Sequence, residues 1–322
     1  MAKLCLIWEG QCDALFYFYK FIRFLTYGKI VYILSCCSTA DISAKHYKKR
    51  NISYISFHYE LGGVWHDDDI ADEKQLPDFY RAMSEGVMTR TSQVNFNEFI
   101  DYFESMLQSE KDVLHICLSS GISGVYNSAV LAAEELREKY PQRKIFVADS
   151  LTASSGCGLL MDKLADLRDS GMSIEEVYNW VLENRLYLHA WFFSTDLTYY
   201  IRGGRISKTA GFIGSVLNIC PLLNIDAQGK LIPRHKIRGK KKVIYTIAQK
   251  MFEFADKGIN YSDKCYISHS DCIEDAKEVA GLIQEKCPNL KEPVLINNIG
   301  TTIGSHTGPG TVALFFWGSQ RQ

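Results

Sequence analysis

The most constraining feature of this chain is a regular alternation of two kinds of segment between residues 29 and 171. Short apolar runs at residues 29–37, 112–120 and 143–150 have the length and composition of buried β-strands. Between them lie longer segments such as residues 124–140, where apolar side chains recur every three or four positions, as on one face of a helix. Strands that alternate with helices are joined by crossover connections, which produce a parallel sheet. We therefore predict a parallel-sheet α/β domain over residues 29–171.

The pattern changes after Gly171, where most of the apolar segments are typical of strands. Residues 292–299 and 311–318 are two such segments, and a Gly-Pro-Gly sequence lies between them. We expect this sequence to close a hairpin, because so short a connection leaves no room for a crossover helix. The second sheet is then at least partly antiparallel, which predicts an α+β domain over residues 172–322. A chain of 322 residues has the length expected of two domains.

The composition limits the classes of function. The 36 lysine and arginine residues are balanced by 37 aspartate and glutamate residues, whereas a general nucleic-acid-binding protein usually carries a basic excess. The ten cysteines form no CxxC pair, so the sequence supports neither a zinc knuckle nor a thioredoxin-type site. We expect these cysteines to be buried apolar residues of a protein in a reducing cytoplasm. We expect no metal and no cofactor.

The first 28 residues do not fit the alternating pattern. The apolar and aromatic stretch at residues 14–34 is interrupted by Lys20, Arg23 and Lys29. A membrane-spanning helix tolerates few charges over its ~20 residues, and a signal peptide places its cations before its apolar region. We therefore predict no membrane span. We expect residues 1–28 to be an extension outside the fold, either an extra helix or the product of a start assigned too far upstream.

A loop rich in serine and glycine is a candidate anion-binding site. Residues 119–129 (SSGISGVYNSA) end one predicted strand and open the next helix. Ligands of open parallel sheets bind at the carboxyl ends of the strands, and a helix N-terminus offers free N–H groups to an anion. Ser119, Ser120 and Ser123 would add hydroxyl donors to this cradle. The loop lacks the lysine of a P-loop, which disfavours a nucleoside triphosphate, and an ordinary helix cap is the alternative.

Three further segments carry polar side chains. Residues 88–94 (MTRTSQV) precede a helix and indicate a capped loop. Residues 199–208 place Arg205 beside a pair of glycines, where a guanidinium can reach an anion. The basic cluster at residues 234–243 is most simply the solvated start of a helix.

His306 lies in a segment of glycine, serine and threonine residues, directly before an apolar run. A metal site would need more ligands nearby, and a structural turn would not need a histidine. A serine hydrolase built from Ser119 or Ser120, Asp149 and His306 is an alternative, but the chain has no GxSxG nucleophile motif.

Together and in this order, the motifs identify a family. From residue 29 to residue 318 the chain resembles the DegV family of bacterial fatty-acid-binding proteins. The resemblance is carried by CSTADI, WHDDDI, TSQV, HICLSSGISGVYNSA, VADSLTASSGCG, YYIRGGRIS, GKLIPRHKIRGKKK, SHSDCIEDA and IGTTIGSHTGPGTVALFF. Each motif is weak alone, whereas nine in one order are specific.

The resemblance implies two domains with a fatty-acid tunnel between them. Family members hold the carboxylate of a long-chain fatty acid at one end of the tunnel, through residues that match His306 and Ser92. Those of the fatty-acid-kinase system present this carboxylate to a separate kinase subunit, which makes the acyl phosphate from ATP. The arginines associated with that step match Arg205 and Arg238. The resemblance thus implies a binding subunit and not an enzyme. Its partner is a fatty acid kinase in members of that system, whereas other members of the family have no assigned partner.

The chain departs from the family pattern at two places. Cys37 stands where the first motif usually begins with aspartate. Val64 and Trp65 stand where a hydroxyl residue usually precedes an aromatic one, so a third carboxylate contact is expected to be missing. The alternative function is a stand-alone enzyme that acts on an acyl or phospho substrate through residues 119–123.

Overall fold

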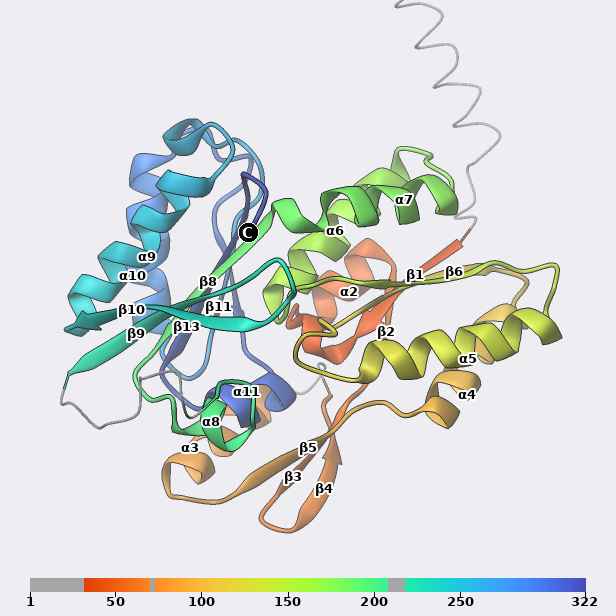
Figure 1. Cartoon of the computed structure of the whole chain (residues 1–322), viewed down its shortest axis with the longest axis horizontal. Coiled ribbons are helices and arrows are strands. Elements are labelled where there is room, and N and C mark those ends of the chain that lie inside the picture. Colours follow the sequence, from red (N-terminus) through yellow and green to blue (C-terminus); the bar gives the residue numbers. More distant parts are fainter. Residues whose placement is uncertain (1–31, 70–72, 208–217) are drawn as a thin grey trace, which may run out of the picture.

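The computed structural model describes residues 32–69, 73–207 and 218–322. The predicted extension at residues 1–28 lies outside these ranges. Three β-sheets organise the described part of the chain, with four, six and three strands (Figure 1). Within these ranges, every helix is too short or too polar to cross a membrane.

The four-stranded sheet is parallel throughout, with the strand order β2-β1-β6-β7, which confirms the predicted parallel-sheet α/β architecture. Its two central strands are among the predicted apolar runs, and Leu34 and Leu114 in them have no exposed surface. Burial on both faces explains why these strands are apolar without alternation. The strands are β1 (Tyr32–Cys37), β2 (Ile52–Ile55), β6 (Asp112–Cys117) and β7 (Ile145–Asp149).

Helices lie on both sides of this sheet, with α4 and α5 on one side and α6 and α7 on the other (Figure 1). Two of them begin with capping boxes, which pair Asn95 with Glu98 and Ser173 with Glu176. Each box satisfies backbone N–H groups that the first helical turn leaves free. The helices are α2 (Ala44–Arg50), α4 (Phe96–Leu107), α5 (Val125–Lys139), α6 (Ser155–Asp169) and α7 (Ile174–Asn184).

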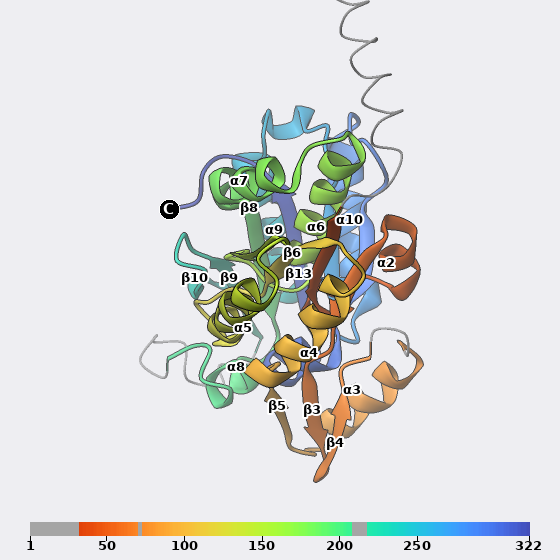
Figure 2. The ribbon, with the colours of Figure 1, turned by 90° about the vertical axis from the view of Figure 1, so that its right-hand side faces the viewer.

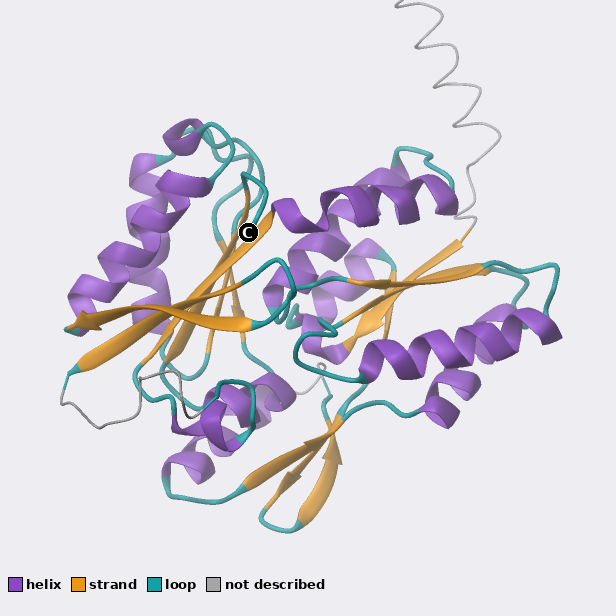
Figure 3. Ribbon diagram, viewed as in Figure 1, coloured by secondary structure: helices purple, strands orange, loops and turns teal. Residues whose placement is uncertain are grey.

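The six-stranded sheet is mixed, with the strand order β10-β9-β8-β13-β11-β12. Only β11 and β12 pair in parallel, so the predicted antiparallel character is confirmed. Helices α9 (Lys240–Phe254) and α10 (Ile273–Lys286) pack against one face of it (Figure 3). The strands are β8 (Leu188–Ser194), β9 (Ile219–Ile225), β10 (Leu231–Arg238), β11 (Tyr266–His269), β12 (Leu295–Asn298) and β13 (Thr311–Trp317).

The predicted hairpin between the last two strands is wrong. Helix α11 (Thr301–Thr307) lies between β12 and β13, and β11 separates the two strands in the sheet. The Gly-Pro-Gly sequence instead follows the C-terminus of α11, where Gly308 has a φ of 67°. A backbone in this left-handed region ends a helix at little steric cost when the residue is glycine.

The small three-stranded sheet lies at one end of the molecule, beside α3 (Leu76–Ser84) (Figures 1 and 2). Its central strand is β3 (His58–Leu61), flanked by the antiparallel strands β4 (Val64–Asp67) and β5 (Thr89–Ser92). Strand β5 corrects the expectation of a capped loop at residues 88–94. The sequence of β5 is polar and lacks apolar alternation, so the sequence pattern did not predict a strand here.

The six-stranded sheet separates two hydrophobic cores. On β13, Ala313 and Phe315 face the core shared with the parallel sheet, whereas Val312, Leu314 and Phe316 face α9 and α10. This alternation follows from the two-residue period of a strand. The domain boundary near residue 171 stays a prediction. Four 3-10 turns and one short helix complete the described elements: η1 (Ser38–Ala40), η2 (Glu73–Gln75), η3 (Arg185–Tyr187), η4 (Gly258–Asn260) and α8 (Thr198–Arg202).

The cysteines of the described ranges are unpaired thiols, and all of them except Cys272 are buried. This confirms the expectation that they serve as small core residues. His115 and His189 are also buried and hydrogen-bonded, the first to Ser35 and the second to the Ser319 carbonyl.

Candidate functional site

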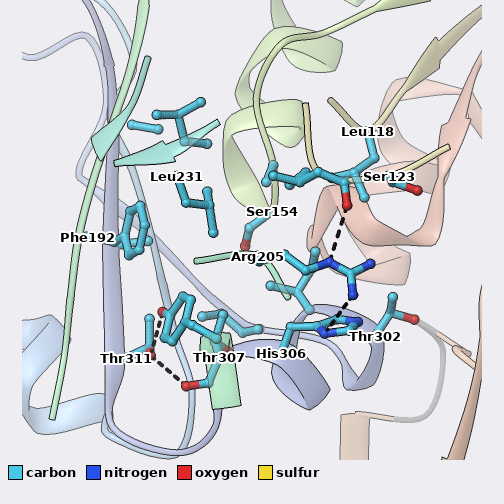
Figure 4. Close-up of a pocket in the computed structure, with 18 of the residues that line it drawn as sticks. Leu118, Ser123, Ser154, Phe192, Arg205, Leu231, Thr302, His306, Thr307 and Thr311 are labelled. Atoms are coloured by element: carbon cyan, nitrogen blue, oxygen red, sulfur yellow. Dashed lines mark hydrogen bonds between the residues drawn. The ribbon is translucent and has the colours of Figure 1, made fainter. Parts of the chain in front are cut away.

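A cavity lies between the parallel sheet and the six-stranded sheet (Figure 4). The empty volume between its lining atoms is about 740 Å³, part of it open to solvent. Residues from both halves of the chain line it, as expected for a site between two structural units. They are Phe57, Thr91, Leu118, Ile122, Ser123, Ala153, Ser154, Ala190, Phe192, Tyr200, Arg205, Ile225, Leu231, Ile299, Thr302, Ile303, His306, Thr307, Thr311, Ala313 and Phe315.

Most of the cavity wall is apolar. Strands β8 and β13 contribute side chains from alternate positions, including Phe192, Ala313 and Phe315. The loops at the carboxyl ends of the parallel strands add Leu118 and Ala153. Ligand sites of open sheets are found at these carboxyl ends. A cavity with such a wall binds a hydrocarbon more readily than a sugar or a nucleotide.

The polar groups of the cavity gather around His306. Its Nε2 atom lies 2.7 Å from Thr91 Oγ1, and its Nδ1 atom lies 3.3 Å from Arg205 Nη1. A guanidinium has only donors, so Nδ1 accepts this hydrogen bond and the ring proton is on Nε2. Nε2 then donates to the Thr91 hydroxyl, whose own proton remains available for a ligand. Arg205, His306 and Thr91 thus form a chain of hydrogen bonds that ends at the cavity.

The electrostatics of this end favour an anionic ligand. Burial, and secondarily the charge of Arg205, lowers the pKa of His306 to about 3, so the imidazole is neutral at pH 7. Burial alone lowers the pKa of Arg205, with no contribution from a neighbouring carboxylate of the described residues. Arg205 otherwise donates to the carbonyl oxygens of Gly203, at 2.7 Å, and Ile122, at 3.3 Å. A partly buried cation without an anionic partner gains stability from a carboxylate ligand.

Distant parts of the chain position His306. The first turn of α11 is held by Asp41 and Asp68, which accept hydrogen bonds from the N–H groups of Gly300, at 3.0 Å, and Thr301, at 3.2 Å. Carboxylates stabilise a helix N-terminus. At the other end of the imidazole the backbone approaches closely, because a Cβ atom on Gly203 would overlap with His306 Nδ1. Glycine at this position of the sequence RGGRI is therefore a steric requirement of the site.

Ser92, the hydroxyl residue expected at the carboxylate, is exposed and lies outside the cavity lining. It follows Thr91 on β5, so the two side chains point to opposite faces of the strand. Ser92 lies opposite His58, and its hydroxyl donates to the Gln93 carbonyl at 3.4 Å. Thr91, a hydroxyl residue of the same segment that the sequence did not assign to the carboxylate, is the residue of β5 that hydrogen-bonds to His306.

The serine-rich loop is largely occupied by interactions within the protein. The Ser119 hydroxyl donates to the Gly229 carbonyl at 2.8 Å, and the Ser120 N–H donates to Asp149 Oδ1 at 3.2 Å. The N–H groups of residues 121–123 bind the hydroxyl or carbonyl oxygen of Ser119. Ser123 lines the cavity, and its hydroxyl donates to Gln93 Oε1 at 3.2 Å. The N–H groups proposed to cradle an anion are therefore engaged inside the loop.

The remaining candidates lie away from His306. Arg238 ends β10 and is exposed, whereas the cavity-lining Leu231 begins the same strand, roughly 20 Å away at about 3.3 Å per residue. Val64 and Trp65 on β4 are also exposed and outside the lining. Cys37 is buried, with its sulfur 3.6 Å from His115 Nε2. In the described ranges, no group of three metal-ligating side chains is close enough to hold an ion.

Comparison with known proteins agrees with this geometry. The family model described as "Uncharacterised protein, DegV family" matches residues 37–318. A DegV domain-containing protein of Clostridium perfringens is 38% identical over 292 residues, which are 90% of this chain and 99% of that protein.

Solved structures show the same fold. A Thermotoga maritima protein, described as revealing a fatty acid binding function, superposes with a TM-score of 0.74 at 28% identity, over 89% of this chain and 99% of its own. DegV of Bacillus subtilis, described as a fatty acid binding protein, has a TM-score of 0.75 at 27% identity, over 90% of this chain and all of its own (100%). The match of the family model over most of the chain, together with these likenesses, establishes that the protein is a member of the DegV family.

Proposed function

We propose that this protein binds a long-chain fatty acid, with the carboxylate at Thr91, His306 and Arg205 and the alkyl chain in the apolar cavity. The observation that carries the proposal is the position of Arg205. Its guanidinium has no carboxylate partner among the described residues and lies in the polar part of a largely apolar cavity. A ligand with an anionic head and a hydrocarbon tail complements both features. The fatty-acid-binding function described for the related structures supports the same ligand class.

The two ends of the ligand make different contributions to the free energy of binding. Burying an alkyl chain contributes roughly 0.8 kcal/mol per methylene, so a sixteen-carbon tail supplies on the order of 10 kcal/mol before ordering costs. Hydrogen bonds to a charged carboxylate contribute about 1.5–3 kcal/mol each. The tail therefore determines the affinity, and the polar groups determine which end of the ligand lies at His306.

Presentation of the bound acid to a separate acyl kinase is the second part of the proposal. The arginines that match the phosphoryl-transfer positions of the family are Arg205 and Arg238. Arg205 contacts His306, so it serves carboxylate binding as well. Arg238 is exposed and outside the cavity lining, where a second protein can reach it. Ser92, which the family resemblance matches to a carboxylate contact, is also exposed and outside the cavity lining.

A pair of variants tests the binding proposal. Leu231 lines the cavity at the start of β10, and the next residue, Ile232, is outside the lining. A tryptophan at position 231 fills the space for the tail, whereas one at 232 adds similar bulk on the other side of the strand. Both variants would be delipidated and titrated with palmitic acid by calorimetry.

We expect Leu231→Trp to lose most of the palmitate affinity and Ile232→Trp to keep it. Octanoic acid, whose tail is half as long, should discriminate less between the two variants. Palmitate binding that is equally tight in Leu231→Trp would show that the tail lies elsewhere.

A further inference from the structure

We propose that the cavity prefers a fatty acid with a hydroxyl group in the carboxyl-proximal part of its chain. This inference rests on the proposed function and specifies its ligand class. It comes from polar groups beyond the Arg205–His306–Thr91 chain, which an unsubstituted acyl chain does not satisfy.

Two residues that line the cavity have a buried hydroxyl group without a hydrogen-bond partner among the described residues. Thr302 is 3% exposed and Thr307 is 9% exposed, and both belong to α11, the helix that carries His306. Neither Oγ1 atom makes a hydrogen bond. Burying a hydroxyl without a partner is costly, so each of these groups is better satisfied when a polar ligand atom reaches it.

The two threonines have different surroundings. Thr302 precedes His306 by four residues, so the two side chains are neighbours on one helix face and Thr302 belongs to the carboxylate end. Thr307 adjoins a second polar group, in which the Tyr200 hydroxyl lies 3.1 Å from Thr311 Oγ1. Thr311 Oγ1 in turn donates to the Thr307 carbonyl at 3.4 Å. We call Thr307, Thr311 and Tyr200 the hydroxyl strip.

The hydroxyl strip lies on the path of the acyl chain. Figure 4 shows Thr302 on one side of His306, with Thr307 and Thr311 on the other, toward Phe192. On β13 the cavity-lining positions continue from Thr311 to Ala313 and Phe315, which are apolar. A chain whose carboxylate is at His306 therefore passes the hydroxyl strip first and reaches the apolar wall afterwards.

The strip suits a neutral oxygen that both donates and accepts. Its three side chains are hydroxyls, and burial raises the pKa of Tyr200, so its phenol is uncharged. Methylene groups placed here offer no partner to the Thr307 hydroxyl, which stays unsatisfied. Because Thr307 lies beside His306, on the side toward Phe192 (Figure 4), the ligand hydroxyl belongs in the carboxyl-proximal part of the chain.

Competition binding of three acids tests this inference. Delipidated wild-type protein would be titrated with palmitic acid, 3-hydroxypalmitic acid and 16-hydroxypalmitic acid, the last of which carries its hydroxyl in the apolar end. We expect 3-hydroxypalmitic acid to bind about threefold to tenfold more tightly than palmitic acid, the effect of one added hydrogen bond. The 16-hydroxy acid should bind more weakly than both.

Two variants test whether the Thr307 hydroxyl causes the preference for the 3-hydroxy acid. Thr307→Val removes the hydroxyl at nearly constant shape, so it should lose the preference for the 3-hydroxy acid and gain affinity for palmitic acid. Thr307→Ser keeps the hydroxyl and should keep the preference.

The possible results separate this inference from the proposed function. Tight binding of palmitic and 3-hydroxypalmitic acids with equal affinity in wild type overturns the inference and leaves the function standing. A preference that survives in Thr307→Val also overturns it. If none of the acids binds, both the function and the inference fail.

Discussion

Replacing His306 by alanine is the change whose effect follows most directly from the site. The imidazole accepts from Arg205 and donates to Thr91, so it links the buried cation to the hydroxyl nearest the cavity. The variant removes this link and leaves the apolar wall intact. We expect the alkyl chain to remain bound while the Thr91 hydroxyl, no longer fixed by the imidazole, loses its hydrogen bond to the carboxylate in a partly desolvated environment.

The magnitude follows from that loss. A hydrogen bond to a charged group contributes about 1.5–3 kcal/mol, so the affinity for palmitic acid should fall roughly tenfold to a hundredfold. Arg205 keeps its bonds to the carbonyl oxygens of Gly203 and Ile122, so it stays in place. The loss is thus attributable to the imidazole and not to a displaced guanidinium.

The assay compares palmitic acid with hexadecanol in wild type and in His306→Ala. The two ligands share the tail and differ in the charge of the head. Wild type should prefer the acid, and the variant should lose most of this preference while its affinity for the alcohol changes little. If mutation weakens both ligands equally, His306 only supports the loop before β13, and our account of the polar end is wrong.

Three further predictions address neighbouring residues. Thr91→Val should lower palmitate affinity about tenfold or more, the effect of one hydrogen bond to a charged group, and Ser92→Ala less than twofold. The reverse order would assign the carboxylate contact to Ser92. Because the pKa of His306 is lowered from 6.5 to about 3 in the folded state, the unfolded state binds more protons below pH 6.5, and stability falls as the pH is lowered toward 3. Between pH 7 and pH 5, urea unfolding should therefore show wild type losing about 2 kcal/mol more than His306→Gln, and parallel losses would contradict the lowered pKa. With ATP and a cognate acyl kinase as proposed above, Arg238→Ala should bind palmitate normally but fail to support acyl-phosphate formation, whereas Arg205→Ala should be impaired in both. A fully competent Arg238→Ala would exclude its phosphoryl-transfer role.

The sequence predicted those parts of the fold that depend on local patterns. The apolar runs of β1, β6 and β7 and the intervening amphipathic helix α5 indicate a parallel sheet wherever they occur. The capping boxes of α4 and α7 are likewise local signals. His306 was recognisable because a histidine among glycines and hydroxyls has few structural reasons to be there.

Other parts depend on contacts between distant residues, which the sequence does not display. Helix α11 is short and rich in glycine and threonine, and its N-terminus is held by Asp41 and Asp68, more than 230 residues earlier in the chain. Whether Thr91 or Ser92 faces His306 depends on which residues of β5 point to which side of the strand. This strand has no apolar alternation from which its two faces could be predicted. The contact between Arg205 and His306 joins residues 101 positions apart. Only the folded structure shows that Arg205 lies beside His306.

Native mass spectrometry of the protein purified from its own cells tests the central claim most directly. We predict a species heavier than the bare chain by the mass of one long-chain fatty acid, which disappears under denaturing conditions. The released ligand should be identified by its fragmentation, and delipidated protein should take up one equivalent again. A protein that is purified without lipid, takes up none and hydrolyses acyl esters would contradict this account and favour a stand-alone enzyme.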